Sequence, residues 1–304
     1  MHSPILKNLS GFAVDLGGTK IAAAAIENGQ VTRALVRPTD GSAGPLELVS
    51  DLSRIAKEIG FEVGQPIGVA VAGRLDNQGL WSAVNTNILK DFSDLPLTQC
   101  LHESLGSGVV ALNDTRAAVI GEYRYGSAQS EKAVAYLTVS TGISAGLMLN
   151  GVALESPNGL LGHVGFMSCK RGTVRCGSGR LGTFESIASG RSIEARAAER
   201  GHKNVDAVSI FQSANSGAEW ARELINESSA AIAELCANLA VGLGIERIVL
   251  GGGVGLATGY LDLVTKYLLN EPQAFRPEIV PAGLGKNSAL YGALSVAIEK
   301  RGTA

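Results

Sequence analysis

The amino-acid sequence predicts an α/β protein of two domains that face each other across a cleft. Two segments, Gly11 to Pro38 and Ala133 to Leu154, share one pattern: an apolar strand, a turn containing glycine, a second strand and an Asn-Gly hairpin. Strand and helix patterns alternate along the rest of the chain, as in α/β proteins. With 304 residues, 45% hydrophobic and 18% charged, the chain is long and apolar enough for two cores. The alternative interpretation is that the two hairpins are alike by chance.

The individual elements follow from hydrophobic periodicity and from glycine stops. The first copy of the pattern has strands over 12–14, 21–26 and 31–36, and the second has strands over 134–139, 147–149 and 152–154. Between the copies we predict helices over 46–59, 95–105 and 115–123 and strands over 66–72 and 108–112. After the second copy we predict helices over 187–200, 205–216, 219–243, 259–269 and 288–300 and a buried strand over 245–250.

Charge and cysteine content exclude several classes of protein. The net charge is −2, so the chain has no overall positive field to hold nucleic acid or an anionic membrane. No apolar run approaches the roughly 20 residues that span a bilayer. Four scattered cysteines fit a reducing compartment better than a disulfide framework. We therefore expect a cytoplasmic protein without a nucleic-acid or membrane partner.

Three glycine-rich turns are candidate nucleotide contacts. Asp15-Leu16-Gly17-Gly18-Thr19-Lys20 follows a buried strand, where glycine lets backbone N–H groups approach phosphate oxygens, and Asp15 could hold Mg²⁺. Ser140-Thr141-Gly142 occupies the mirrored place in the second copy, so the two loops could hold a polyphosphate from both sides. Gly251 to Gly255 lies between a strand and a helix, a place suited to a nucleotide. The first turn is not a Walker A loop, and each turn alone could be a plain turn.

The dipeptide Asn113-Asp114 is a candidate catalytic element. It lies at the end of a predicted strand and at the start of a helical stretch. A carboxylate there could take the proton of a substrate hydroxyl while phosphorus is attacked, which is the base role in kinases. The competing interpretation is a helix N-cap, a position that both residue types favour.

Taken in this order, these motifs resemble the ROK family of sugar kinases and related repressors. The resemblance runs from Phe12 to about Ala297 and is closest to the family's N-acetylmannosamine kinases, through the segments 185–193 and 252–261. It implies an actin-like (ribonuclease H-like) sugar kinase fold with Mg²⁺ and ATP in an interlobe cleft. The implied smaller lobe is 1–112 plus 290–304, and the larger lobe is 113–289. A homodimer is expected by the same analogy.

The resemblance also assigns roles to single residues. Asp114 matches the base that takes the proton of the sugar 6-hydroxyl. The positions that match sugar contacts are Gly73, Arg74, Thr86, Asn113, His163 and Glu185. The positions that match ATP contacts are Asp15, Gly17, Gly18, Thr19, Lys20, Ser140, Thr141, Gly142, Gly252, Gly253 and Val254.

This chain departs from the family pattern where relatives bind a structural zinc ion. Aligned without gaps, Phe166 stands at the histidine ligand, and Cys176, Ser178 and Thr183 stand at the three cysteines. One of four ligands survives, and a tetrahedral zinc site needs all four, so we predict no zinc. Phe166 also replaces a histidine that contacts the sugar in the family. Ser144-Ala145-Gly146 stands where Gly-Gly-Gly is usual, and those side chains either crowd the phosphates or pack against a neighbouring strand.

These observations lead to one expected activity with stated alternatives. We expect ATP-dependent phosphorylation of the 6-hydroxyl of N-acetylmannosamine, a step of sialic acid catabolism. The alternatives are a glucokinase, another N-acetylhexosamine kinase of the family, or a catalytically impaired sugar-binding protein. Only 14 residues precede Asp15, which leaves no room for the DNA-binding segment of the repressors, so we expect no DNA binding.

Overall fold

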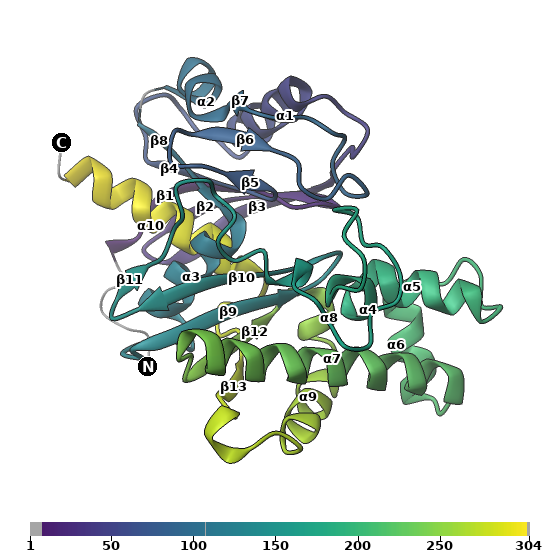
Figure 1. The fold of residues 1–304 in the computed structure, drawn as a ribbon. Helices are drawn as coiled ribbons and strands as arrows, with labels where there is room; N and C mark the ends of the chain where they lie inside the picture. The colour runs from purple at the N-terminus through teal and green to yellow at the C-terminus, as the bar shows by residue number, and fades with distance from the viewer. Residues whose placement is uncertain (1–7, 107, 303–304) are drawn as a thin grey trace.

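The computed structural model describes residues 8–106 and 108–302 and shows two mixed five-stranded sheets, one above the other (Figure 1). The first sheet has the order β3-β2-β1-β4-β8, with bounds Gln30–Pro38, Lys20–Glu27, Gly11–Leu16, Ile67–Val71 and Val109–Asn113. The second has the order β11-β10-β9-β12-β13, with bounds Val152–Ala153, Ile143–Leu149, Ala133–Val139, Arg247–Gly251 and Glu278–Pro281. The predicted α/β class is confirmed, and the two hairpin segments do occupy equivalent places in the two sheets.

The first sheet is covered on its outer face by α1 (Pro45–Glu58) and α2 (Leu97–Leu105) (Figure 1). Their apolar faces pack with β1 and β4 into one core, in which Leu48, Leu52 and Leu101 are fully buried. A small sheet extends this layer, with order β5-β6-β7 and bounds Arg74–Leu75, Leu80–Ser82 and Leu95–Pro96.

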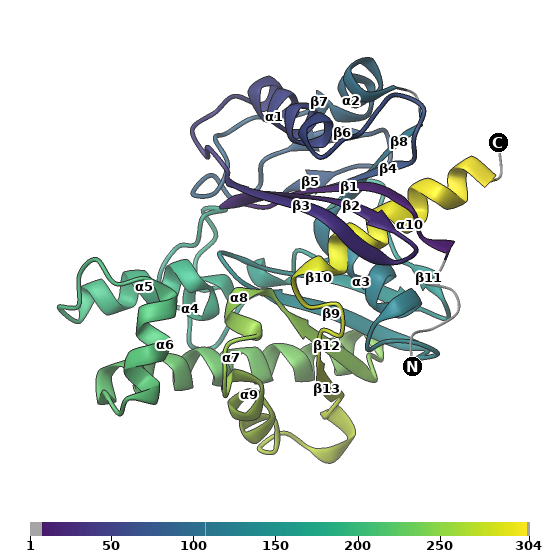
Figure 2. The same cartoon turned by 180° about the vertical axis from the view of Figure 1, so that it is seen from behind.

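The second sheet is covered on its outer face by the longest helix, α7 (Glu219–Leu243), and by α9 (Tyr260–Leu268) (Figure 2). Three shorter helices complete this core at one end of the sheet: α4 (Glu185–Ala188), α5 (Gly190–Glu199) and α6 (Ala207–Asn215). α8 (Gly252–Gly255) is a single turn directly after β12. Short 3-10 turns cover Val164–Phe166, Gln273–Phe275 and Gly285–Asn287.

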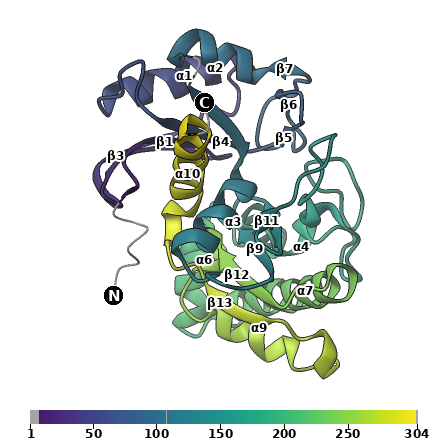
Figure 3. The same ribbon diagram turned by 90° about the vertical axis from the view of Figure 1, so that its left-hand side faces the viewer.

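Two helices lie between the sheets, α3 (Asp114–Tyr125) and α10 (Ser288–Gly302) (Figure 3). Small residues let them approach closely: a Cβ on Gly292 would lie 1.7 Å from the Ala117 carbonyl oxygen, and one on Gly121 would lie 2.2 Å from the Ser288 carbonyl oxygen. Alanines of both helices pack against strands of both sheets in one core. The two layers therefore share a tightly packed connection.

Some sequence predictions need correction. The helix predicted over 187–200 is two helices, because Ser189 turns the chain and caps α5 by accepting a hydrogen bond from the Ser192 N–H. The helix predicted from 95 begins at Leu97, since Leu95–Pro96 pairs with β6 as a strand. Strand β13 and the β5-β6 hairpin were not predicted, because their short segments carry no clear alternation. No described helix is long and apolar enough to cross a membrane.

Candidate active site

A cavity of about 300 Å³ opens between the two sheets at the carboxyl ends of their central strands. The strand register creates it, because Leu16, Val71 and Asn113 lie side by side at the ends of β1, β4 and β8. In the second sheet Thr138 of β9 lies beside Gly251 at the end of β12. The predicted site residues that line the cavity are Asp15, Gly17, Gly18, Thr19, Lys20, Gly73, Asn113, Asp114, Ser140, Thr141, Gly142, His163, Glu185, Gly252 and Gly253.

Three predicted site residues lie outside the lining. Arg74 forms an ion pair with Asp94 at 2.9 Å. The Thr86 hydroxyl donates to the Gly177 carbonyl oxygen at 3.2 Å. Val254 is buried in the core of the second sheet. Because these side chains are engaged elsewhere, the structure does not bring them to the cavity wall.

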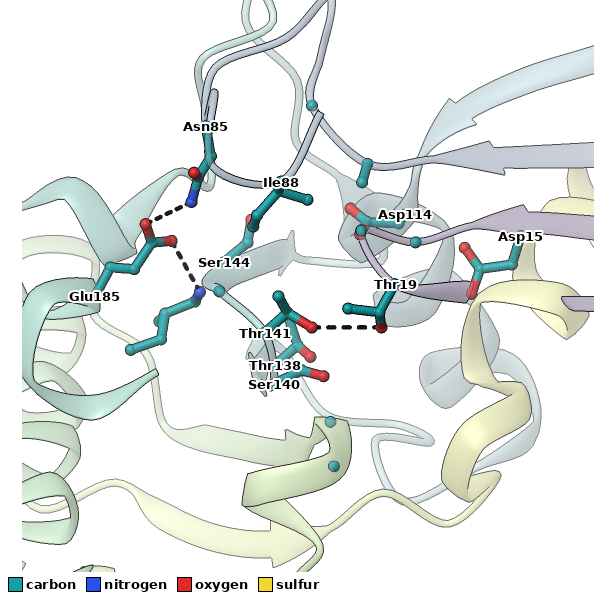
Figure 4. A pocket seen from close by; sticks show the side chains of 18 of the residues that line it. Asp15, Thr19, Asn85, Ile88, Asp114, Thr138, Ser140, Thr141, Ser144 and Glu185 are labelled. Carbon is teal, nitrogen blue, oxygen red and sulfur yellow. Dashed lines mark hydrogen bonds between the residues drawn. The ribbon is translucent and has the colours of Figure 1, made fainter. Parts of the chain in front are cut away.

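The two glycine-containing loops face each other across the cavity (Figure 4). Each is a tight turn, closed by a hydrogen bond from Gly17 N–H to the Lys20 carbonyl and from Ser140 N–H to the Gly142 carbonyl, both 2.9 Å. The Thr141 hydroxyl lies 3.5 Å from that of Thr19. Hydroxyl and amide donors from both sheets thus converge on one space, which suits a ligand with several anionic oxygens.

Asn113 and Asp114 divide the two roles that the sequence left open. The Asn113 side-chain oxygen accepts from the N–H groups of Thr115 and Arg116 and so caps α3, while its amide donates to the Gly73 carbonyl oxygen at 3.0 Å. Asp114 accepts a hydrogen bond from the Thr115 N–H at 2.8 Å and faces the cavity (Figure 4). Since Asn113 is the cap, the Asp114 carboxylate is available for chemistry.

Burial changes the proton affinity of the carboxylates at the site. It raises the pKa of Asp114 from 3.8 to about 6, against the opposing effect of the Thr115 N–H. Burial, and then the charge of Asp114, raise the pKa of Asp15 from 3.8 to about 7, although Lys20 lowers it. Asp15 Oδ1 is buried without a hydrogen-bond partner among the described residues. An unpartnered oxygen beside a second carboxylate is a donor set that fits Mg²⁺.

The other end of the cavity carries groups suited to a sugar. One Glu185 oxygen accepts from the Asn85 side-chain amide at 2.7 Å and the other from the Ile143 N–H at 3.3 Å (Figure 4). Burial raises the pKa of Glu185 from 4.5 to about 7. The ring of His163 stacks on Phe166 with centroids 5.9 Å apart, and burial lowers the pKa of His163, which favours the neutral imidazole. His163 Nδ1 lies 3.1 Å from the Leu160 carbonyl oxygen and donates to it, so the Glu185 carboxylate and the free ring nitrogen of His163 both offer acceptors for hydroxyl groups.

The sequence reasoning missed several residues of the cavity wall. They are Ala72, Val84, Asn85, Ile88, Leu89, Tyr136, Thr138, Ile143, Leu256, Gly285 and Lys286. Tyr136 and Thr138 alternate on β9, and this alternation is a signal that could have placed both on one face of the sheet. Asn85 and Ile88 belong to an irregular segment between β6 and β7, where no periodic pattern exists.

The segment that departs from the zinc pattern is held by protein contacts. The Cys176 thiol lies 3.1 Å from the Ser178 hydroxyl, and Thr183 exchanges hydrogen bonds with Ser186. No group of three or more His, Cys, Asp or Glu side chains in residues 8–106 and 108–302 could hold a metal ion. The absence of zinc stays a prediction. The Ser144 hydroxyl donates to the Gly162 carbonyl oxygen at 3.1 Å and lies 3.3 Å from the Thr115 hydroxyl.

Comparison with known proteins decides the family. The ROK family profile matches residues 11–300. The chain belongs to the ROK family. Among curated proteins it is 36% identical over 284 residues to the N-acetylmannosamine kinase of Haemophilus influenzae, which covers 92% of this chain and 93% of that protein. It is 35% identical over 294 residues to the N-acetylmannosamine kinase of an Escherichia coli O7:K1 strain, covering 96% and 100%. The expected enzyme class, a sugar kinase, is confirmed by the family and these relatives.

Solved structures of this family have the same fold. The ROK hexokinase from Thermus thermophilus superimposes with a TM-score of 0.76 at 30% identity, covering 97% of this chain and 100% of that chain. A ROK family glucokinase from Streptomyces griseus, solved in complex with glucose and AMPPNP, has a TM-score of 0.82 at 24% identity, covering 95% and 99%. The predicted two-lobed, actin-like sugar kinase fold is confirmed.

Proposed function

We propose that this ROK sugar kinase transfers the γ-phosphoryl group of ATP to the 6-hydroxyl of N-acetylmannosamine. The observation that supports the substrate is the identity of about one third, over almost the whole chain, to two proteins named N-acetylmannosamine kinase. The observation that supports the reaction is one cavity wall that carries Asp114, two donor-rich loops and the sugar-compatible groups of Glu185 and His163.

The site supports a direct in-line transfer. The Asp114 carboxylate takes the proton of the sugar 6-hydroxyl as that oxygen attacks the γ-phosphorus, and the bond between the γ-phosphorus and the bridging oxygen breaks to release ADP. The loops at Gly17 and Ser140 bind the phosphate oxygens through N–H and hydroxyl groups. Mg²⁺, held with ATP beside Asp15, would neutralise charge on the phosphates.

The arrangement at the other end of the cavity supports a hexose as the acceptor. Glu185 and His163 bind ring hydroxyls, and such paired buried hydrogen bonds discriminate strongly between sugars. Phe166 places an aromatic ring beside His163, so the pocket has an apolar side next to its acceptors. We propose that this apolar side accommodates the acetamido methyl group of the sugar.

A glucokinase or another hexokinase is the second candidate. The 30% identity to the Thermus thermophilus ROK hexokinase over nearly all of both chains favours it. A homodimer is a further proposal that rests on family analogy alone, and light scattering after gel filtration tests it.

A coupled ADP-release assay with Mg-ATP tests the substrate. N-acetylmannosamine, N-acetylglucosamine and glucose are compared at equal concentrations, with the Asp114→Asn protein as the control for background hydrolysis. We expect the highest kcat/KM with N-acetylmannosamine. A higher kcat/KM with glucose would replace the proposal by a glucokinase. Sugar binding in calorimetry without ADP release from any of the three would indicate the impaired sugar-binding protein.

A further inference from the structure

The segment 83–92, between β6 and β7, is anchored to the core of the first sheet. Leu89 is buried there and Ile88 packs against the same core. The Asn85 backbone carbonyl accepts from the N–H groups of Ile88 and Leu89 at 3.0 and 3.1 Å, and its side-chain oxygen accepts from the Asn87 N–H at 3.1 Å. Both oxygens of Asn85 are thus used within the segment, and its side-chain NH₂ group points out across the cavity (Figure 4).

The partner of that NH₂ group belongs to the other layer. Glu185 begins α4, whose neighbours Phe184 and Ile187 lie in the core of the second sheet. The Asn85 Nδ2 to Glu185 Oε1 distance is 2.7 Å, and the residues are 100 positions apart in the chain. Glu185 is itself only 5% exposed. This short hydrogen bond therefore joins the two layers at the sugar end of the cavity.

Gly177, in a loop of the second layer, leaves room for the Asn85 side chain. A Cβ on Gly177 would lie 1.7 Å from the Asn85 side-chain oxygen, closer than any real contact. The Gly177 carbonyl oxygen also accepts from the Thr86 N–H at 3.1 Å. The loop that carries Gly177 therefore leaves space for Asn85 at the place where it meets Glu185.

We propose that Asn85 is a positioning residue that holds the Glu185 carboxylate in the orientation that accepts a sugar hydroxyl. Asn85 Nδ2 donates to one Glu185 oxygen and the Ile143 N–H donates to the other, so the carboxylate plane is held from both sides while lone pairs stay available for the sugar. Because the donor comes from the first layer, the orientation is complete only when the two layers are closed. This inference rests on the proposed function, since it deepens the role of Glu185 at that site.

A neutral amide suits this task better than its alternatives. An aspartate at position 85 would place a second negative charge 2.7 Å from Glu185 and force it to turn away or take up a proton. An alanine would leave the buried carboxylate oxygen without its donor, which costs more than the mere loss of a contact. Both substitutions remove the hydrogen bond to Glu185, the aspartate by charge repulsion and the alanine by loss of the donor.

The test compares Asn85→Ala and Asn85→Asp with Asn87→Ala, an exposed neighbour in the same segment. Melting temperature and circular dichroism establish folding first. We expect Asn85→Ala to raise the sugar KM about tenfold, which corresponds to about 1.4 kcal/mol, and Asn85→Asp to raise it further. The ATP KM and all constants of Asn87→Ala should stay within about twofold of wild type, because neither involves Glu185.

A double-mutant cycle distinguishes positioning of Glu185 from a purely structural contact between the two layers. In a Glu185→Ala background the Asn85→Ala change should lower sugar kcat/KM by less than about twofold, because its target is gone. Gly177→Ala should raise the sugar KM with Asn85 intact, and it serves if the Asn85 variants fail to fold. Three results would overturn the inference. The effects of the two substitutions on sugar kcat/KM could multiply independently in the cycle, or Asn85→Ala could raise the sugar KM and the ATP KM equally. The third is a sugar KM of Asn85→Ala within twofold of wild type.

The outcome also distinguishes this inference from the proposed function. A wild-type protein that phosphorylates a hexose while Asn85→Ala behaves like Asn87→Ala overturns the role of Asn85 alone. A wild-type protein that binds ATP and phosphorylates none of the three sugars overturns both.

Discussion

Replacing Asp114 with asparagine should destroy turnover and yet stabilise the fold. The substitution keeps size and shape, and the asparagine oxygen can still accept from the Thr115 N–H, as the carboxylate does at 2.8 Å. It removes the proton acceptor. A positioned general base contributes roughly 10² to 10⁴ in rate, so kcat should fall by that factor, or about 2.7 to 5.4 kcal/mol.

The stability change has the opposite sign because burial opposes the charge of Asp114. Its pKa rises from 3.8 to about 6 in the folded protein. At about 1.36 kcal/mol for each pKa unit, the ionised group destabilises the fold by up to about 3 kcal/mol above pH 6. A neutral asparagine escapes this cost, so its Tm at pH 8 should exceed that of wild type by a few degrees. The difference should shrink as pH falls from about 6 toward 3.8, because folded wild-type Asp114 then gains its proton.

Two assays check these effects on the same preparations. Thermal unfolding at pH 8 and pH 5 measures the difference in Tm, and the coupled ADP assay measures kcat. The same pKa predicts that wild-type kcat/KM falls as pH drops through about 6, since the base must be ionised. An Asp114→Asn protein with kcat within tenfold of wild type would refute the base role. A variant less stable than wild type at pH 8 would refute the argument from burial.

Further predictions concern packing, the sugar end of the site and the metal. Gly292→Ala should destabilise the fold by about 1 to 3 kcal/mol, because its Cβ would lie 1.7 Å from the Ala117 carbonyl oxygen; Gly302→Ala, in the same helix with open space around it, should be neutral in urea unfolding. Gly142→Ala should lower sugar kcat/KM at least about tenfold, since its Cβ would lie 2.7 Å from Glu185 Oε2, and an unchanged value would contradict the placement of that carboxylate. EDTA should abolish ADP release and added Mg²⁺ should restore it; activity that persists in EDTA would contradict a metal-assisted transfer.

The fold was predictable where local patterns are strong. The Asn-Gly turns at Asn28 and Asn150 both adopt the positive φ that such hairpins need, 51° and 50°. Long amphipathic helices such as α1 and α7 were placed within a residue or two. Short elements were missed, because the strand pairing of Leu95–Pro96 depends on a partner that no local pattern reveals.

The same distinction holds for the site residues: those at the ends of predicted strands were predictable, and those in irregular segments were not. Asp15, Asp114 and the two glycine-containing loops all follow predicted strands, and the structure brings them to one cavity, because strands in register end at one edge of a sheet. Asn85 was missed because an irregular segment gives no clue to the direction of its side chain. Val254 was assigned to the nucleotide but packs in the core, since a single turn of helix after β12 points it inward.

By itself the sequence determined the α/β class, the family motifs and the residue types that can do kinase chemistry, because hydrophobic period, turn residues and spacing are local properties of the chain. Only the tertiary structure decided which carboxylates share a buried space, that Asn113 rather than Asp114 caps α3, and that Asn85 meets Glu185 across 100 residues. Burial and hydrogen bonding between distant segments exist only when the two layers are packed, and these determine proton affinity and orientation at the site.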